Sequence, residues 1–227
     1  MAYKTRLGGN SATFDSMMRN GFGVVTVMNA KIYAIKANEN FASQTASAIR
    51  TAYKQETPLA TIDSLKVANV TVEGPNKTVS GGQYSNPLIK FGKSARLEMQ
   101  DALGRADAIQ AFGGSINEYA SKDGDLTAMH VTEDFAPTRL VIGESFFVDR
   151  TTGGQVKVDI IFYQVLPDSI FNLTQDAEGD ATVFDMNADL LTTNIKVPTD
   201  GSDSTITDVE HGVFYSILAY EEPKQTT

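Results

Sequence analysis

Residues 139–165 read RLVIGESFFVDRTTGGQVKVDIIFYQV, and this stretch decides the fold class. Two runs rich in β-branched and aromatic residues, 139–149 and 155–165, flank the connection RTTGG at residues 150–154. Runs of this kind on either side of a short, glycine-containing connection are typical of a β-hairpin. The stretch therefore predicts two long antiparallel strands.

The second run predicts how the hairpin lies in the protein. Its apolar residues Val156, Val158 and Ile160 alternate with Lys157 and Asp159. Because successive side chains of a strand point to opposite faces, one face is expected in the core and the other in water.

Shorter strand patterns occur on both sides of the hairpin, at residues 23–28, 61–72, 127–132, 181–191 and 213–220. Residues 31–37 continue the first of these strands or pair with it. Residues 41–53 are rich in Ala, Ser and Thr, which leaves a short helix and a loop as alternatives. The simplest architecture is one mainly β domain over 1–227, an antiparallel β-sandwich or small barrel with one flanking α-helix.

We place that flanking helix at residues 94–112. Ser94 suits an N-cap, and Gly113 and Gly114 suit the end of the helix. One face collects apolar side chains at helical spacing: Ala95, Met99, Ala102, Leu103, Ala106 and Ile109.

Two further segments are expected to lack regular structure. Residues 1–20 are polar and rich in Gly, Asn and Ser, which predicts an extended N-terminal arm. Residues 73–87 read EGPNKTVSGGQYSNP, and this density of Gly, Pro, Asn and Ser predicts a long loop or an irregular hairpin.

Composition excludes several classes of protein. The chain has no cysteine, so disulfides, thiolate metal sites and cysteine nucleophiles are ruled out. No window approaches eighteen consecutive apolar residues, and the basic N-terminus has no apolar block behind it. We therefore expect no membrane insertion and no signal peptide, with folding in a cytoplasm.

The net charge of −9 is distributed unevenly along the chain. Residues 1–100 carry 12 Lys and Arg against 6 Asp and Glu, a balance of +6, whereas residues 101–227 carry 7 against 22, a balance of −15. An acidic surface repels nucleic acid, because DNA binding needs cations that displace phosphate counterions. Two interpretations of the acidic half remain. Its charge keeps the protein soluble, or it forms a charged surface that faces a specific partner.

Two short motifs resemble parts of catalytic sites. Gly92-Lys93-Ser94 ends like a phosphate-binding loop, but Pro87 occupies the position where that loop needs its first glycine. Gly143-Glu144-Ser145 lacks the second glycine of a nucleophile elbow and lies within a predicted strand. Neither motif supports catalysis.

Metal-binding and acid–base patterns are also incomplete. His130 and His211 are far apart, and nothing nearby in the sequence pairs either with an acid. The acidic segments 176–180 and 200–208 lack the Asp-x-Asp-x-Asp-Gly spacing of a calcium loop. We expect no enzyme activity, no cofactor and no metal, although paired carboxylates for glycoside hydrolysis cannot be read from sequence.

Three segments resemble those of bacteriophage virion structural proteins: residues 72–103, residues 143–161 and residues 173–190. The whole layout of β-sandwich or barrel, flanking helix, long loop and N-terminal arm is similar to that of phage tail tube proteins. The resemblance implies hexameric rings whose sheets join into one barrel, stacked into a tube that conducts DNA through an acidic lumen.

The resemblance also implies partners and a location. The chain would assemble with itself in the host cytoplasm, contact the tape-measure and other tail proteins, and reside in the virion tail, with dsDNA passing through unbound. Alternatives are another virion component (tail terminator, baseplate or head decoration protein) or a carbohydrate-binding or enzymatic β-domain. The absence of Trp and the scattered Phe and Tyr residues speak against a carbohydrate-binding module.

Two sets of residues are candidates for these roles. The first set, in the long loop at 73–87, would contact the neighbouring ring and comprises Lys77, Thr78, Val79 and Tyr84. The second set, in the acidic loops, would line the lumen and comprises Asp176, Glu178, Asp180, Asp200 and Asp203. The basic residues of 1–100 are expected at subunit contacts or on the outside.

Overall fold

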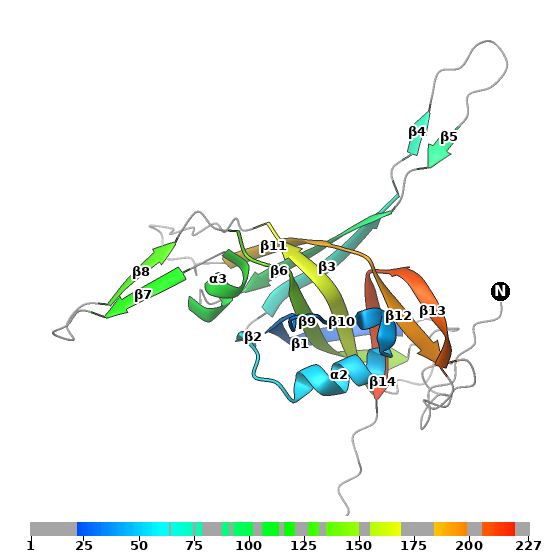
Figure 1. The fold of residues 1–227 in the computed structure, drawn as a ribbon, viewed down its shortest axis with the longest axis horizontal. Coiled ribbons are helices and arrows are strands. Elements are labelled where there is room, and N and C mark those ends of the chain that lie inside the picture. The colour runs from blue at the N-terminus through cyan, green and yellow to red at the C-terminus, as the bar shows by residue number, and fades with distance from the viewer. Residues whose placement is uncertain are drawn as a thin grey trace, which may run out of the picture.

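The computed structural model shows a mainly β protein with antiparallel sheets and short helices (Figure 1). The structure describes residues 22–63, 65–74, 76–78, 88–90, 93–101, 106–113, 116–120, 127–131, 135–149, 155–168, 184–198 and 206–220. The predicted fold class, an antiparallel β-sandwich with a flanking helix, is confirmed. Within the described residues, no helix is long and apolar enough to cross a membrane.

In the part of the chain that the structure describes, the main sheet has eight strands: β1 (Phe22–Ala34), β2 (Ala60–Ile62), β3 (Leu65–Glu73), β6 (Ser94–Asp101), β9 (Arg139–Asp149), β10 (Gln155–Pro167), β11 (Phe184–Leu190) and β14 (Tyr215–Tyr220). Three two-stranded sheets accompany it: β4 (Asn76–Thr78) with β5 (Leu88–Lys90), β7 (Ile116–Ala120) with β8 (Thr127–Val131), and β12 (Thr193–Pro198) with β13 (Ile206–Val213). The helices are a 3-10 turn η1 (Phe41–Ser43), α2 (Ala46–Lys54) and α3 (Ala106–Gly113).

The predicted hairpin is the centre of the main sheet. β9 pairs with β10 from Val148 opposite Gln155 to Val141 opposite Phe162. The strand order β2-β1-β9-β10-β11-β6-β3 then runs outward from this pair, and β14 also pairs with β10. The long central strands supply the surface on which everything else packs.

The sheet folds over on itself and encloses the main core. Inward side chains of β6 and β11, such as Leu97 and Met186, pack with Ile32 of β1 and Val141 of β9, and all four are at most 1% exposed. Burying one such side chain stabilises the fold by roughly 1.5–3 kcal/mol. This shared core makes β3-β6-β11 one layer of a sandwich and β2-β1-β9-β10 the other.

The other face of the central strands is covered by residues 41–54, which form η1 and α2. The sequence pattern allowed either a short helix or a loop for this segment. Thr45 caps α2, its hydroxyl accepting a hydrogen bond from the Ala48 N–H at 3.2 Å. One turn apart on this helix, Ile49 and Tyr53 are both buried against the sheet, and Tyr53 meets Tyr33 edge to face. The segment is therefore part of the packed body.

The prediction of a helix over 94–112 is wrong in its first half. Residues 94–101 form strand β6, and α3 begins only at Ala106. Ala95, Leu97 and Met99 are all buried while Ser94 and Glu98 are exposed, which is the two-residue period of a strand. Ala95 and Met99 suit a helix equally well by spacing alone, and pairing with β3 and β11 decides between them.

The solvated face predicted for β10 is also wrong. Asp159 is 0% exposed because α2 covers it, and Lys157, whose ammonium lies over the Phe146 ring, is partly buried. The long loop at 73–87 is partly regular, since Asn76–Thr78 pairs with Leu88–Lys90 as a hairpin. The predicted arm at 1–20 lies outside the described residues.

Candidate assembly surfaces

One end of the β3–β6 pair extends beyond the core as a two-stranded ribbon, with the β4–β5 hairpin at its tip (Figure 1). Val70 and Val72 lie opposite Leu97 and Ala95, so they share the face that encloses the core. Leu97 and Ala95 are buried, yet Val70 is 37% exposed and Val72 is 42% exposed. The core-side face of the ribbon is therefore an apolar surface that its own chain leaves uncovered.

The structure places the predicted contact residues only in part. Lys77 and Thr78 lie in β4, so two of the four are at the tip of the ribbon. Val79 and Tyr84 fall outside the described residues, as do all five lumen candidates: Asp176, Glu178, Asp180, Asp200 and Asp203.

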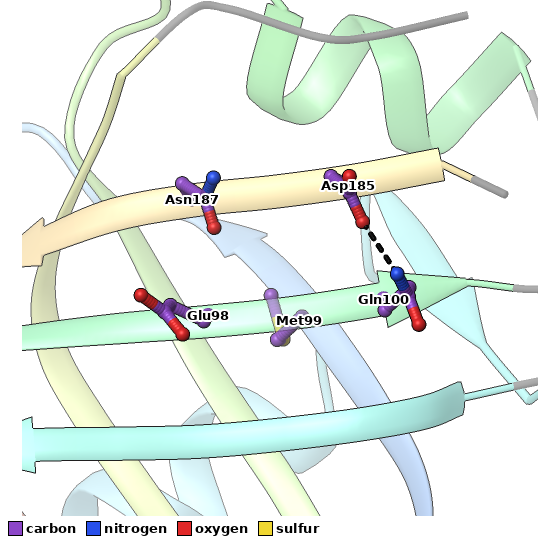
Figure 2. Close-up of a pocket in the computed structure, with 5 residues that line it drawn as sticks. All are labelled: Glu98, Met99, Gln100, Asp185 and Asn187. Carbon is purple, nitrogen blue, oxygen red and sulfur yellow. Dashed lines mark hydrogen bonds between the residues drawn. The ribbon is translucent and has the colours of Figure 1, made fainter. Parts of the chain in front are cut away.

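The outer face of the same layer is polar and mainly acidic. Figure 2 shows an open groove lined by Glu98 and Gln100 of β6 and by Asp185 and Asn187 of β11, while Met99 points to the core side. Gln100 donates a hydrogen bond from Nε2 to Asp185 Oδ1 at 2.8 Å, and Glu98 stands opposite Asn187 across the strands. The groove thus presents carboxylates and amides to solvent.

Arg96 is a cation on this face. Its guanidinium pairs with Asp168, which follows β10, and with Asp189 of β11 at 3.3 Å. Glu98 lies 3.9 Å away on the same strand. Three carboxylates surround one arginine, so the charge of this cluster stays negative.

A second charged cluster lies beneath α2 and is largely buried. Asp159 of β10 and Glu144 of β9 are direct cross-strand neighbours, and like charges in that position repel. Lys54 bridges them, with Nζ 2.8 Å from Glu144 Oε1 and 2.7 Å from Asp159 Oδ2. Arg50 pairs with Asp159, and Lys31 of β1 lies 3.5 Å from Glu144. We call these five residues the α2 clamp.

The sequence explains why α2 supplies these cations. Arg50 and Lys54 are one turn apart, each directly after a buried residue, Ile49 or Tyr53. Residues four apart share a helix face, so two cations flank the apolar stripe that meets the sheet. Sequence reasoning missed the clamp, although Glu144 inside the apolar run RLVIGESFFV was a signal for it.

The clamp holds Glu144 and Lys54 in their charged forms. Burial alone would raise the pKa of Glu144, but hydrogen bonds from Lys54 and Asn29 outweigh burial and bring it to about 2. Burial opposes the charge of Lys54 too, yet its hydrogen bonds to Asp159 and Glu144 raise its pKa. Groups held this far from neutral pH are poor proton donors and acceptors, so the clamp is a structural device.

Replacing Glu144 should remove a pH-dependent part of stability. The pKa of Glu144 falls from 4.5 to about 2 on folding, so its contribution is present above pH 4.5 and is lost as pH falls toward 2. We expect Glu144→Gln to lower the free energy of unfolding by about 2–3 kcal/mol at pH 7. Urea unfolding at pH 7, 5, 4 and 3 should show the gap to wild type shrinking below pH 4.5.

Glu98→Gln is the matched control, because Glu98 is 48% exposed and its ion pair with Arg96 is long, at 3.9 Å. That variant should stay within about 1 kcal/mol of wild type throughout. If Glu144→Gln lowers the free energy of unfolding by the same amount at pH 3 as at pH 7, the stabilisation does not depend on the ionised Glu144 carboxylate.

The motifs that resemble catalytic sites find no support in the structure. Ser94 opens strand β6, so no helix N-terminus follows Lys93 to receive a phosphate. Ser145 is buried at 2% exposure within β9. His211 is exposed in β13, and no group of three or more His, Asp or Glu side chains among the described residues could hold a metal ion.

A comparison of the sequence with protein-family models found no matching family, and a comparison with curated proteins found no match either.

Proposed function

We propose that this protein is a structural subunit of a phage tail tube, which assembles into stacked rings around a DNA-conducting lumen. The observation that carries the proposal is the β3–β6 ribbon, whose core-side valines, Val70 and Val72, are exposed beyond the body of the chain. A monomer gains nothing from a projecting strand pair with an uncovered apolar face, whereas a neighbouring subunit would cover it.

Open strand edges give further support. In the part of the chain that the structure describes, β3 pairs on one side only, with β6, and β14 pairs on one side only, with β10. An unpaired edge is a template for another strand, and closed rings remove such edges without aggregation. The sheets of adjacent subunits would continue one another, as the resemblance to tail tube proteins implies.

The acidic outer face of β6 and β11 is the lumen surface in this proposal. Glu98, Asp185 and Asp189 lie there together with the cation Arg96. A negative wall repels the phosphate backbone, so DNA would pass without binding. Measurable affinity for dsDNA at physiological salt would contradict this assignment.

The remaining roles follow from the same proposal. The subunit would bind copies of itself, the tape-measure protein and other tail proteins, without membrane insertion. Its location would be the virion tail, after assembly in the host cytoplasm. No cofactor, metal or catalytic step is part of this function.

Self-assembly is the direct test. We expect sedimentation velocity over a wide range of concentration and salt to show rings and larger species, and negative-stain images of the same samples to show tubes. A monomer that persists under every condition would contradict the proposal. Closed rings that never stack would favour another virion component, such as a tail terminator.

A further inference from the structure

The core-side face of the ribbon carries a cation beside its valines. Val72 lies opposite Ala95, and Glu73 lies opposite Ser94, where the pairing of the two strands ends. The same register continued outward would place Gly74 opposite Lys93. In agreement, a Cβ on Gly74 would lie 3.8 Å from Lys93 Cγ. Lys93 is two residues before Ala95 and therefore on its face, and it is exposed. The ribbon thus presents Val70, Val72 and Lys93 together.

The β12–β13 hairpin also presents an exposed valine beside charged side chains, but these side chains are acidic. Ile195 is buried against α2 and the central sheet, and two residues later Val197, on the same face, is 37% exposed. Across the strands, Glu210 stands opposite Ile195 and Asp208 opposite Val197, and both acids are exposed. This hairpin therefore also continues a core face into solvent, with two carboxylates beside its valine.

The wider charge of the two segments is complementary too. Residues 65–93 hold four Lys and one Glu, whereas residues 193–213 hold one Lys and four Asp or Glu. Opposite surface charges speed association and select the register in which two surfaces meet.

We propose that the ribbon of one copy docks against the β12–β13 hairpin of a second copy. Val70 and Val72 would pack on Val197, and Lys93 would pair with Asp208 and Glu210. The contact joins two different surfaces of the same chain, so it is head-to-tail and propagates from copy to copy. This inference rests on the proposed self-assembly and names the surface that receives the ribbon.

Charge reversal on each side tests the pairing. Lys93→Glu, and separately Asp208→Lys with Glu210→Lys, should each raise the concentration for half-assembly by about tenfold or more, because each places like charges against one another. The triple variant restores opposite charges in every contact and should assemble within about threefold of wild type. Sedimentation of the full chain at low and physiological salt measures all four proteins.

Two valines of the hairpin provide a matched control. Val197 and Val209 are each 37% exposed, but Val209 stands opposite Lys196 and therefore on the other face. Val197→Ser should weaken assembly, and Val209→Ser should not. Circular dichroism and thermal unfolding establish that each variant is folded before its assembly is compared.

The outcomes separate this inference from the proposed function. If wild type assembles, but the triple variant is no better than Lys93→Glu, or both valine variants behave alike, the ribbon does not dock on β12–β13 and self-assembly still stands. If wild type never leaves the monomer, the proposed function fails first, and the docking surface fails with it.

Discussion

Asp159→Ala is expected to lower the free energy of unfolding by about 3 kcal/mol, more than any other single substitution considered for this protein. Asp159 is 0% exposed and binds both cations of α2, Arg50 and Lys54. Removing one partner of a buried ion pair leaves the other charge without compensation, which typically costs about 3–5 kcal/mol. The lower end of this range applies here for two reasons. Lys54 retains its ion pair with Glu144, and the Arg50 side chain is 23% exposed and can reach water.

Denaturant unfolding at pH 7 measures this effect, and Asp189→Ala is the matched control. Asp189 is also a strand aspartate paired with an arginine, Arg96, but its side chain is 59% exposed. An exposed pair contributes at most about 1 kcal/mol, so the control should stay near wild type. Equal losses from the two substitutions would show that α2 is not held by the buried carboxylate.

Removing the β4–β5 hairpin should abolish tube formation while the subunit stays folded. Gly74 and Lys93 lie side by side at the root of the hairpin, so a two-residue Asn-Gly turn in place of residues 75–92 can join them with hairpin geometry. The main core lies in the body and loses none of its buried members. Ordering a backbone segment costs about 1–2 kcal/mol per residue, and contacts with a neighbouring ring would offset that cost.

Far-ultraviolet circular dichroism and urea unfolding check the fold of the shortened protein, and negative-stain images check its assembly. Because Val70, Val72 and Lys93 remain in place, closed rings are still expected, but their stacking into tubes should be lost. Tubes of normal length from the shortened protein would show that the hairpin is not an inter-ring contact.

Sequence alone determined the elements whose pattern is local. Within residues 139–165, the strand-forming residues and the turn between them are all adjacent in sequence. The structure confirms both strands. Strands at 22–34, 127–131, 184–190 and 215–220 likewise match predicted segments to within a few residues. Side chains alternate wherever a strand has one covered face, so these positions need no knowledge of the partner.

Tertiary structure decided the elements whose pattern fits two periods. Ala95 and Met99 are four residues apart, a spacing that a helix and a strand both satisfy. As a strand, residues 94–101 need hydrogen-bond partners for their backbone N–H and C=O groups, and pairing with β3 and β11 supplies them.

The α2 clamp and the uncovered ribbon were likewise beyond local reasoning. Asp159 alternates with valines as a solvent-facing residue should, and its burial depends on a helix that lies more than a hundred residues earlier in the chain. Val70 and Val72 alternate as core residues should, and they are exposed because the layer that would cover them ends before the ribbon does. A sequence pattern states which face of a strand is apolar, whereas the packing of distant segments determines whether anything covers that face.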